Sequence, residues 1–186
     1  MAKKKLYEDT IYCNLFGGPG TGKSTMMADV FSRLKWMGVD CEIATEYAKD
    51  KVWEGSLGVL ECQVYVFGKQ VFRNYRLKHK VKVVITDSPI LLSPIYDKRK
   101  SPAFLNLVLE EFNRFNNVNV FLKRDKKYNP NGRLQTRDQA VQKDKEILDL
   151  LSFHNISFMT FEGKKQSASI IADILKRKAK DIKKLK

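Results

Sequence analysis

A glycine-rich turn, GGPGTGKS at residues 17–24, lies between a predicted strand and a predicted helix. The preceding run, Ile11–Phe16, is apolar and typical of a buried strand, and the following run, Lys23–Met37, carries apolar residues at helical spacing. The turn fits the pattern G-x-x-x-x-G-K-[ST] of a phosphate-binding loop, or P-loop. This feature restricts the chain to folds in which a strand, a loop and a helix together bind a polyphosphate.

The residue types of the turn suit that chemistry. Glycines let successive main-chain N–H groups approach phosphate oxygens, and the helix that starts at Lys23 adds unpaired N–H groups and the positive end of its dipole. We expect Lys23 to reach the β- and γ-phosphates, Ser24 to coordinate Mg²⁺, and Thr25 to support the α-phosphate end. The predicted nucleotide-binding residues are Gly18, Gly20, Thr21, Gly22, Lys23, Ser24 and Thr25.

Strand-like and helix-like runs alternate along the rest of the chain. The predicted strands are residues 11–16, 40–45, 81–86, 118–122 and 156–161, and the predicted helices are 23–37, 59–77, 103–115, 136–153 and 167–180. This alternation predicts an α/β fold with a five-stranded parallel sheet and helices on both faces. No repeat or linker interrupts it, so we expect one domain over residues 1–186.

Two carboxylates follow predicted strands. Asp87 follows the predicted strand VKVVIT, and Glu46 follows the predicted strand DCEIAT. Because ligands of parallel sheets lie beyond the carboxyl ends of the strands, Asp87 is expected next to the P-loop if its strand neighbours the first one, and Glu46 is expected at the same end of the sheet. Asp87 would hold Mg²⁺ together with Ser24, the alternative being a plain Asp-Ser-Pro turn. Glu46 would take a proton from an attacking hydroxyl, the alternative being an acid at a helix start.

A polar segment at residues 123–137 carries Asn-Pro and Asn-Gly signals and is predicted to be a loop. Arg133 and Arg137 lie near its end. We expect an arginine-bearing lid that closes over the triphosphate and places guanidinium charge on the transferring group. The alternative is an ordinary solvated basic loop.

The combination resembles the P-loop nucleoside and nucleotide kinase family, which includes deoxynucleoside and thymidylate kinases. TDSP at residues 86–89 stands where that family carries an Asp-Arg-Ser/Tyr motif, TEYA at 45–48 where it carries an acceptor glutamate, and GRLQTR at 132–137 resembles its lid. CQVYVF at 62–67 is similar to the Gln-x-Tyr of deoxynucleoside kinases. This similarity implies that Gln63 reads a base edge, the alternative being an exposed helix residue.

The chain departs from that family at Ser88, which stands in place of an arginine. Arg73, Arg76 or Arg99 would then supply the charge, and Arg73 is taken as a substrate-binding residue. TEYAKD also resembles the matching part of nicotinamide-riboside kinase domains. The small size and compact lid resemble kinases encoded by large bacteriophages for modified-nucleotide metabolism.

The formal net charge is +14, and much of it lies at the two ends of the chain. Residues 176–186 hold seven basic residues and one acid, and Lys3, Lys4 and Lys5 add three charges. Basic ends of this kind are either solvated extensions or attract polyanions such as nucleic acid. The charge leaves open a kinase that acts on a hydroxyl of nucleic acid, at a 5′ end or on a modified base.

The resulting expectation is an ATP- and Mg²⁺-dependent kinase that transfers the γ-phosphate to a nucleoside or nucleotide. A P-loop ATPase or GTP-binding switch in an assembly is less favoured. The segment LKRDKK lacks the asparagine of a guanine reader, and Ser88 stands where a motor ATPase would place an acid. The oligomeric state stays open, a homodimer included.

The apolar runs, the cysteines and the tryptophans indicate where the protein is located and how it packs. No apolar run reaches the ~18–20 residues of a membrane span, and the start MAKKKLYEDT lacks the apolar region of a signal peptide. Three widely spaced cysteines predict neither a disulfide framework nor a zinc site, which indicates a reducing, cytoplasmic setting. Trp36 and Trp53 are interpreted as packing residues rather than base-stacking platforms.

Overall fold

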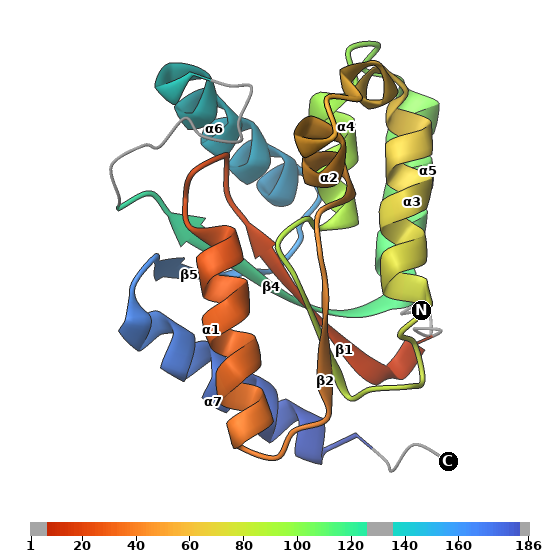
Figure 1. Cartoon of the computed structure of the whole chain (residues 1–186). Helices are drawn as coiled ribbons and strands as arrows, with labels where there is room; N and C mark the ends of the chain where they lie inside the picture. The colour runs from red at the N-terminus through yellow and green to blue at the C-terminus, as the bar shows by residue number, and fades with distance from the viewer. Residues whose placement is uncertain (1–6, 126–135, 183–186) are drawn as a thin grey trace.

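The protein is described here by a computed structural model, which covers residues 7–125 and 136–182. Its centre is one sheet of five parallel strands in the order β2-β3-β1-β4-β5 (Figure 1). The strands are β1 (Tyr7–Phe16), β2 (Cys41–Ala44), β3 (Val83–Thr86), β4 (Phe115–Lys123) and β5 (Met159–Glu162). The prediction of a five-stranded parallel sheet is therefore confirmed.

Helices connect the strands, and their bounds depart from the sequence prediction in one region. The α-helices are α1 (Lys23–Trp36), α2 (Tyr47–Trp53), α3 (Gln63–Tyr75), α4 (Ser93–Tyr96), α5 (Pro102–Arg114), α6 (Arg137–Phe153) and α7 (Lys165–Lys180). Two 3₁₀ turns, η1 (Leu57–Glu61) and η2 (Ile90–Leu92), complete the set in the described residues.

The prediction of one helix over residues 59–77 is wrong, because η1 ends at Glu61 and α3 starts at Gln63. Between them, Cys62 has φ −93° and ψ 79°, which is not helical. Helices α2 and α4 were not predicted at all. With seven and four residues, they are too short to display a helical apolar period.

The two faces of the sheet are covered by different helices, as β1 illustrates. Ile11, Cys13 and Leu15 point to the face packed by α1 and α7, and Tyr12 and Phe16 point to the face packed by α3, α5 and α6. All five side chains are at most 2% exposed. Alternate residues of one strand thus serve two apolar layers, which is what a sheet buried on both faces requires.

The strand order decides which segments meet at the P-loop. The central strand β1 pairs with β3 on one side and β4 on the other, with Asn14 opposite Thr86 and Phe16 opposite Phe121. Strand β2 pairs with β3, with Ala44 opposite Thr86. Because all strands are parallel, the segments that follow β1, β2, β3 and β4 emerge at the same end of the sheet, the end formed by the carboxyl ends of the strands.

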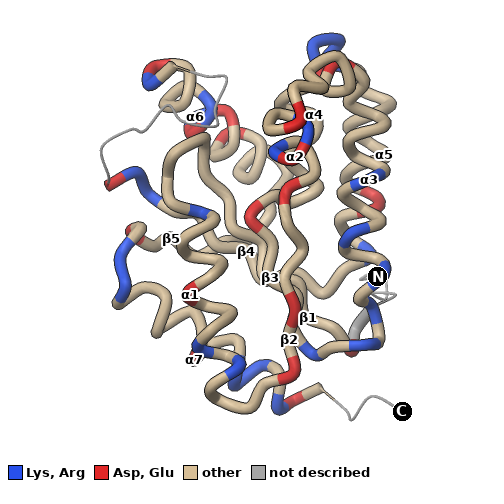
Figure 2. Tube along the Cα trace, in the orientation of Figure 1, with Lys and Arg blue, Asp and Glu red and all other residues tan. Residues whose placement is uncertain are grey.

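The basic C-terminal part of α7 lies at the opposite end of the sheet from the P-loop, near the amino ends of the strands. Helix α7 follows β5 and packs along α1, so it runs back from the P-loop edge toward the amino ends of the strands (Figure 1). Lys and Arg recur along α7 and the segment that leads toward the C-terminus (Figure 2). Within the described residues, no helix is long and apolar enough to cross a membrane.

Trp36 and Trp53 do not pack in the core. Their exposed fractions are 88% and 68%, so the interpretation of both as packing residues is wrong. Each is the last residue of its helix, α1 or α2.

Candidate active site

The P-loop backbone has the conformation that its glycines permit. Gly20 and Gly22 have φ of 83° and 91°, in the left-handed region that disfavours other residues. The Lys23 ammonium lies across the loop and donates to the carbonyl oxygens of Gly17 (2.7 Å) and Gly18 (3.0 Å). The Thr21 hydroxyl donates to the Gly18 carbonyl at 3.1 Å. The loop is thus a defined concave turn with one cation at its rim.

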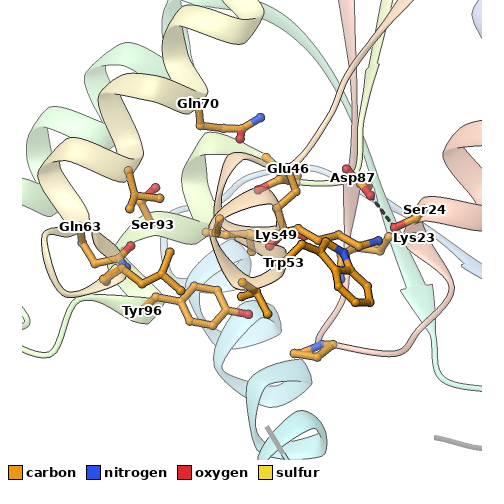
Figure 3. A pocket seen from close by; sticks show the side chains of 18 of the residues that line it. Lys23, Ser24, Glu46, Lys49, Trp53, Gln63, Gln70, Asp87, Ser93 and Tyr96 are labelled. Atoms are coloured by element: carbon orange, nitrogen blue, oxygen red, sulfur yellow. Dashed lines mark hydrogen bonds between the residues drawn. The ribbon is translucent and has the colours of Figure 1, made fainter. Parts of the chain in front are cut away.

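Ser24 and Asp87 meet next to this turn. The Ser24 hydroxyl donates to Oδ2 of Asp87 at 2.6 Å (Figure 3). Asp87 is 3% exposed, and among the described residues its buried Oδ1 has no hydrogen-bond partner. Since an unsatisfied buried carboxylate oxygen is costly, a cation beside it would be stabilising.

This pair fits Mg²⁺, which binds few protein ligands and completes its shell with water and phosphate oxygens. In the described part of the chain, no cluster of three or more His, Cys, Asp or Glu side chains forms an all-protein metal site. Ser24 and Asp87 are therefore the residues that would hold the ion.

Glu46 precedes α2, and its side chain makes no capping bond to that helix. It instead lines a cavity together with Lys23 and Asp87. Burial raises the pKa of Glu46 above its usual range, Lys23 acts to lower it, and Asp87 raises it further. Burial likewise lowers the pKa of Lys23, while Glu46 and Asp87 oppose that shift. Glu46 is at the same time the N-cap residue of α2, so the alternative of an acid at a helix start stays open beside its place in the cavity.

The cavity has a volume of about 640 Å³ and extends from the P-loop to α3 (Figure 3). Its far part is lined by Gln63, Gln70, Tyr96, Ser93, Val66, Leu60 and Leu92. Gln63 is 7% exposed and donates to the Leu60 carbonyl at 2.7 Å, so the alternative of an exposed helix residue is wrong. Gln70 binds the main chain of Thr45 and Tyr47, which fixes the segment that carries Glu46.

The positive side chains that line this cavity are lysines. They are Lys23, Lys49 and Lys98. Trp53 lines the cavity as well, although it is largely exposed. In the described ranges 7–125 and 136–182, no arginine is among the lining residues.

The three arginines considered as substitutes at Ser88 lie elsewhere. Arg73 donates to the Thr45 carbonyl (3.1 Å) and hydroxyl (2.6 Å), and forms an ion pair with Asp50. Arg99 bonds Asp97 at 3.2 Å, and Arg76 is exposed after the end of α3. These contacts indicate that Arg73 holds the segment after β2 in place rather than binding a substrate in the cavity.

Of the two predicted lid arginines, Arg133 lies outside the described residues. Arg137 is the first residue of α6 and is exposed. Thr136 is the N-cap of α6: its hydroxyl accepts from Gln139 N–H at 3.3 Å, and the Gln139 side chain accepts from Thr136 N–H at 2.8 Å.

Two further residues contact the P-loop and were not singled out in the sequence. Arg124, directly after β4, donates to the Pro19 carbonyl at 2.9 Å, and Asp144 of α6 accepts from Gly18 N–H at 2.5 Å. The position of Arg124 at the carboxyl end of a strand was the one signal that could have indicated it.

Gly18→Ala is expected to destabilise the protein. A Cβ at this position would lie 2.5 Å from the Ala140 carbonyl oxygen and 2.8 Å from Asp144 Oδ1, so α6 would have to shift. We expect the free energy of unfolding, measured in urea, to fall by about 1–3 kcal/mol.

Gly68→Ala is the matched control, because nothing lies within 4 Å of its added Cβ, at an exposed position inside α3. That change should stabilise the protein by up to ~1 kcal/mol. A Gly18→Ala protein as stable as the wild type would show that α6 does not press on the P-loop.

The fold and the site define the class of the protein: an α/β P-loop domain with the architecture of a nucleotide kinase. Residues 12–167 match the profile of a family described as an AAA domain, and the chain belongs to that family. Among curated proteins, no sequence matches this chain.

Among solved structures, the chain is similar to deoxyadenosine kinase from M. mycoides with bound dATP, with a TM-score of 0.53 and 20% sequence identity. The match covers 89% of this chain and 99% of that chain. At this identity, the similarity establishes a shared fold.

Proposed function

We propose that this protein is a kinase that transfers the γ-phosphate of ATP, with Mg²⁺, to the hydroxyl of a nucleoside-type acceptor. One observation carries the proposal: the P-loop lysine, the Ser24–Asp87 pair and Glu46 all face one cavity that continues to Gln63. The fold shared with a deoxyadenosine kinase supports the same class of reaction.

Each residue has a defined role in this proposal. The P-loop main chain and Lys23 bind the triphosphate, and Ser24 and Asp87 hold Mg²⁺, which would neutralise charge on the phosphates. Glu46 accepts the proton of the attacking hydroxyl. Gln63, whose amide both donates and accepts, orients the acceptor ring at the far end of the cavity. Catalysis then consists mainly of positioning and charge stabilisation.

The nature of the cavity favours a neutral acceptor ring and a hydroxyl nucleophile. Its far part combines two buried amides, Gln63 and Gln70, with Tyr96 and apolar side chains. A phosphate acceptor is already anionic and has no need of a base such as Glu46, whereas an alcohol does. Nucleosides with a neutral base are therefore placed ahead of nucleotides.

A hydroxyl on nucleic acid is the second candidate, because of the net charge of +14. The basic part of α7 lies at the end of the sheet opposite the P-loop. The positive charge of α7 therefore does not line the cavity. A titration with DNA and RNA over a salt series tests this candidate, since phosphate contacts weaken steeply with salt. Absence of binding at low salt removes it.

The direct test of the proposed function is an assay with labelled ATP, Mg²⁺ and separate acceptors. The panel contains nucleosides, nucleoside monophosphates, nicotinamide riboside and a DNA oligonucleotide. The proposal expects label on at least one compound with a free ribose or deoxyribose hydroxyl. If label passes only to water, the protein is an ATPase and the proposal is wrong.

Glu46→Gln is expected to lower kcat/KM by about 10²-fold or more and to remove its acid limb. Glu46 works as a base only when deprotonated, and its pKa lies above the ordinary 4.5. Wild-type activity should therefore be present above this raised pKa and fall as the pH drops through it. The measurement is the pH profile of kcat/KM for both proteins.

Glu110→Gln is the control, because Glu110 is an exposed glutamate on α5 that does not line the cavity. It should keep both the rate and the acid limb. An acid limb that stays in place in Glu46→Gln would assign the titration to another group.

A further inference from the structure

Arg124 and Asp144 form a bonded network behind the P-loop. Asp144 Oδ1 accepts from Gly18 N–H at 2.5 Å, and its Oδ2 accepts from Arg124 Nε at 2.9 Å and Nη2 at 2.8 Å. Arg124 also donates from Nη1 to the Pro19 carbonyl at 2.9 Å and from Nη2 to the Ala140 carbonyl at 3.2 Å. Both side chains are largely buried, with exposed fractions of 14% and 17%.

The network joins three parts of the fold that are distant in sequence. Arg124 follows β4, Asp144 lies on α6, and both bind the backbone of the P-loop. Asp144 stands seven residues, or about two turns, after Arg137, so the two residues share a face of α6. The ion pair is therefore one of the contacts that tie α6 to the phosphate-binding turn.

The charges of the pair also act on the phosphate-binding cation. Asp144 acts to raise the pKa of Lys23, and Arg124 acts to lower it, so each is within electrostatic range of the Lys23 ammonium. A carboxylate in this place repels an anionic ligand of Lys23 unless a cation compensates it. Arg124 supplies that cation in a fork geometry that suits a carboxylate.

We propose that Arg124 and Asp144 are positioning residues for the nucleotide. Asp144 holds the first part of the P-loop through Gly18 N–H, and Arg124 neutralises Asp144 so that the loop accepts a triphosphate. The proposal rests on the triphosphate site of the proposed function, and it is independent of the acceptor.

A charge-compensating pair differs from a purely structural brace in its response to a double substitution. Removing Arg124 alone leaves a largely buried carboxylate beside the phosphates, which is costly. Replacing Asp144 by Asn removes the negative charge and keeps an oxygen that accepts from Gly18 N–H. The second change should therefore restore what the first one loses, whereas two lost contacts of a brace would not restore each other.

The test measures the Kd of a non-hydrolysable ATP analogue with Mg²⁺ by calorimetry, alongside the Tm of the unliganded proteins. Arg124→Gln should weaken binding by about tenfold or more, and Asp144→Asn by less than about threefold. The double variant Arg124→Gln/Asp144→Asn should bind more tightly than Arg124→Gln. Arg124→Lys, which keeps the charge but loses the fork geometry, should weaken binding less than Arg124→Gln does.

Two results would overturn the proposal alone: Arg124→Gln that binds like the wild type, or a double variant that binds no better than Arg124→Gln. If Arg124→Gln is unfolded by its Tm, Arg124→Lys decides, and a tenfold loss in that variant counts against charge compensation. A wild-type protein that does not bind the analogue would overturn the proposed function and this inference with it.

Discussion

Lys23→Ala should reduce phosphoryl transfer by about 10³-fold or more and leave the fold intact. The Lys23 ammonium is the cation at the rim of the P-loop, where it lies 2.7 Å from the Gly17 carbonyl oxygen. Charge that develops on the transferring group would lose the ammonium donor of the P-loop. Rates with labelled ATP and the best acceptor measure the loss, and far-UV circular dichroism with a thermal melt checks the fold.

Lys178→Ala is the matched control, because Lys178 is an exposed lysine near the end of α7, away from the P-loop edge. It should retain the wild-type rate. A Lys23→Ala protein with near-normal kinase activity would remove the basis of the proposed function.

Asp87→Asn is the second substitution with a large expected effect. We expect the rate to fall by about 10²–10³-fold, with a higher Mg²⁺ concentration needed for half-maximal activity. The amide loses the negative charge and presents an NH₂ group where one carboxylate oxygen stood, and Asp87 Oδ1 is the buried oxygen left free for a cation. An Mg²⁺ titration of the rate measures the change.

The same substitution should not lower the Tm of the unliganded protein. Asp87 is 3% exposed and adds to the negative charge around Glu46, whose pKa it raises. Neutralising it relieves that repulsion, and the Asn carbonyl oxygen keeps an acceptor for the Ser24 hydroxyl. Asp173→Asn, an exposed position on α7, serves as the control and should alter neither quantity. Full activity of Asp87→Asn at low Mg²⁺ would exclude Asp87 as the metal ligand.

The P-loop and the two carboxylates could be placed from sequence because each follows directly from a strand end. Once the strands were predicted to be parallel in one sheet, Asp87 and Glu46 were expected at the same end of the sheet as Lys23. The structure brings these three residues to one cavity. The strand order β2-β3-β1, which was not predicted, makes them neighbours.

Residues on α3 show where such reasoning ends. Gln63, Val66, Phe67 and Gln70 form the buried face of this helix, and Gln63 reaches the cavity. Arg73 lies one turn further along, where it meets Thr45 and Asp50 rather than the cavity. Which turn of a helix faces a ligand depends on how the helix is placed against the sheet, and the sequence pattern carries no such information.

The contact between Arg124 and Asp144 was missed for a similar reason. The two residues are 20 positions apart, on either side of a polar segment, and they meet only because α6 packs against the P-loop. In the sequence, each is one of many charged residues in a chain with 35 Lys and Arg and 21 Asp and Glu. Only the packing of α6 singles them out.

The central claim is that the P-loop binds the triphosphate of ATP within reach of Glu46. A crystal structure with Mg²⁺ and a non-hydrolysable ATP analogue at saturating concentration tests it most directly. The account predicts phosphate oxygens on the main-chain N–H groups of residues 20–25 and on Lys23, with the metal between Ser24, Asp87 and the phosphates. A nucleotide bound elsewhere, or a P-loop left without phosphate under these conditions, would contradict it.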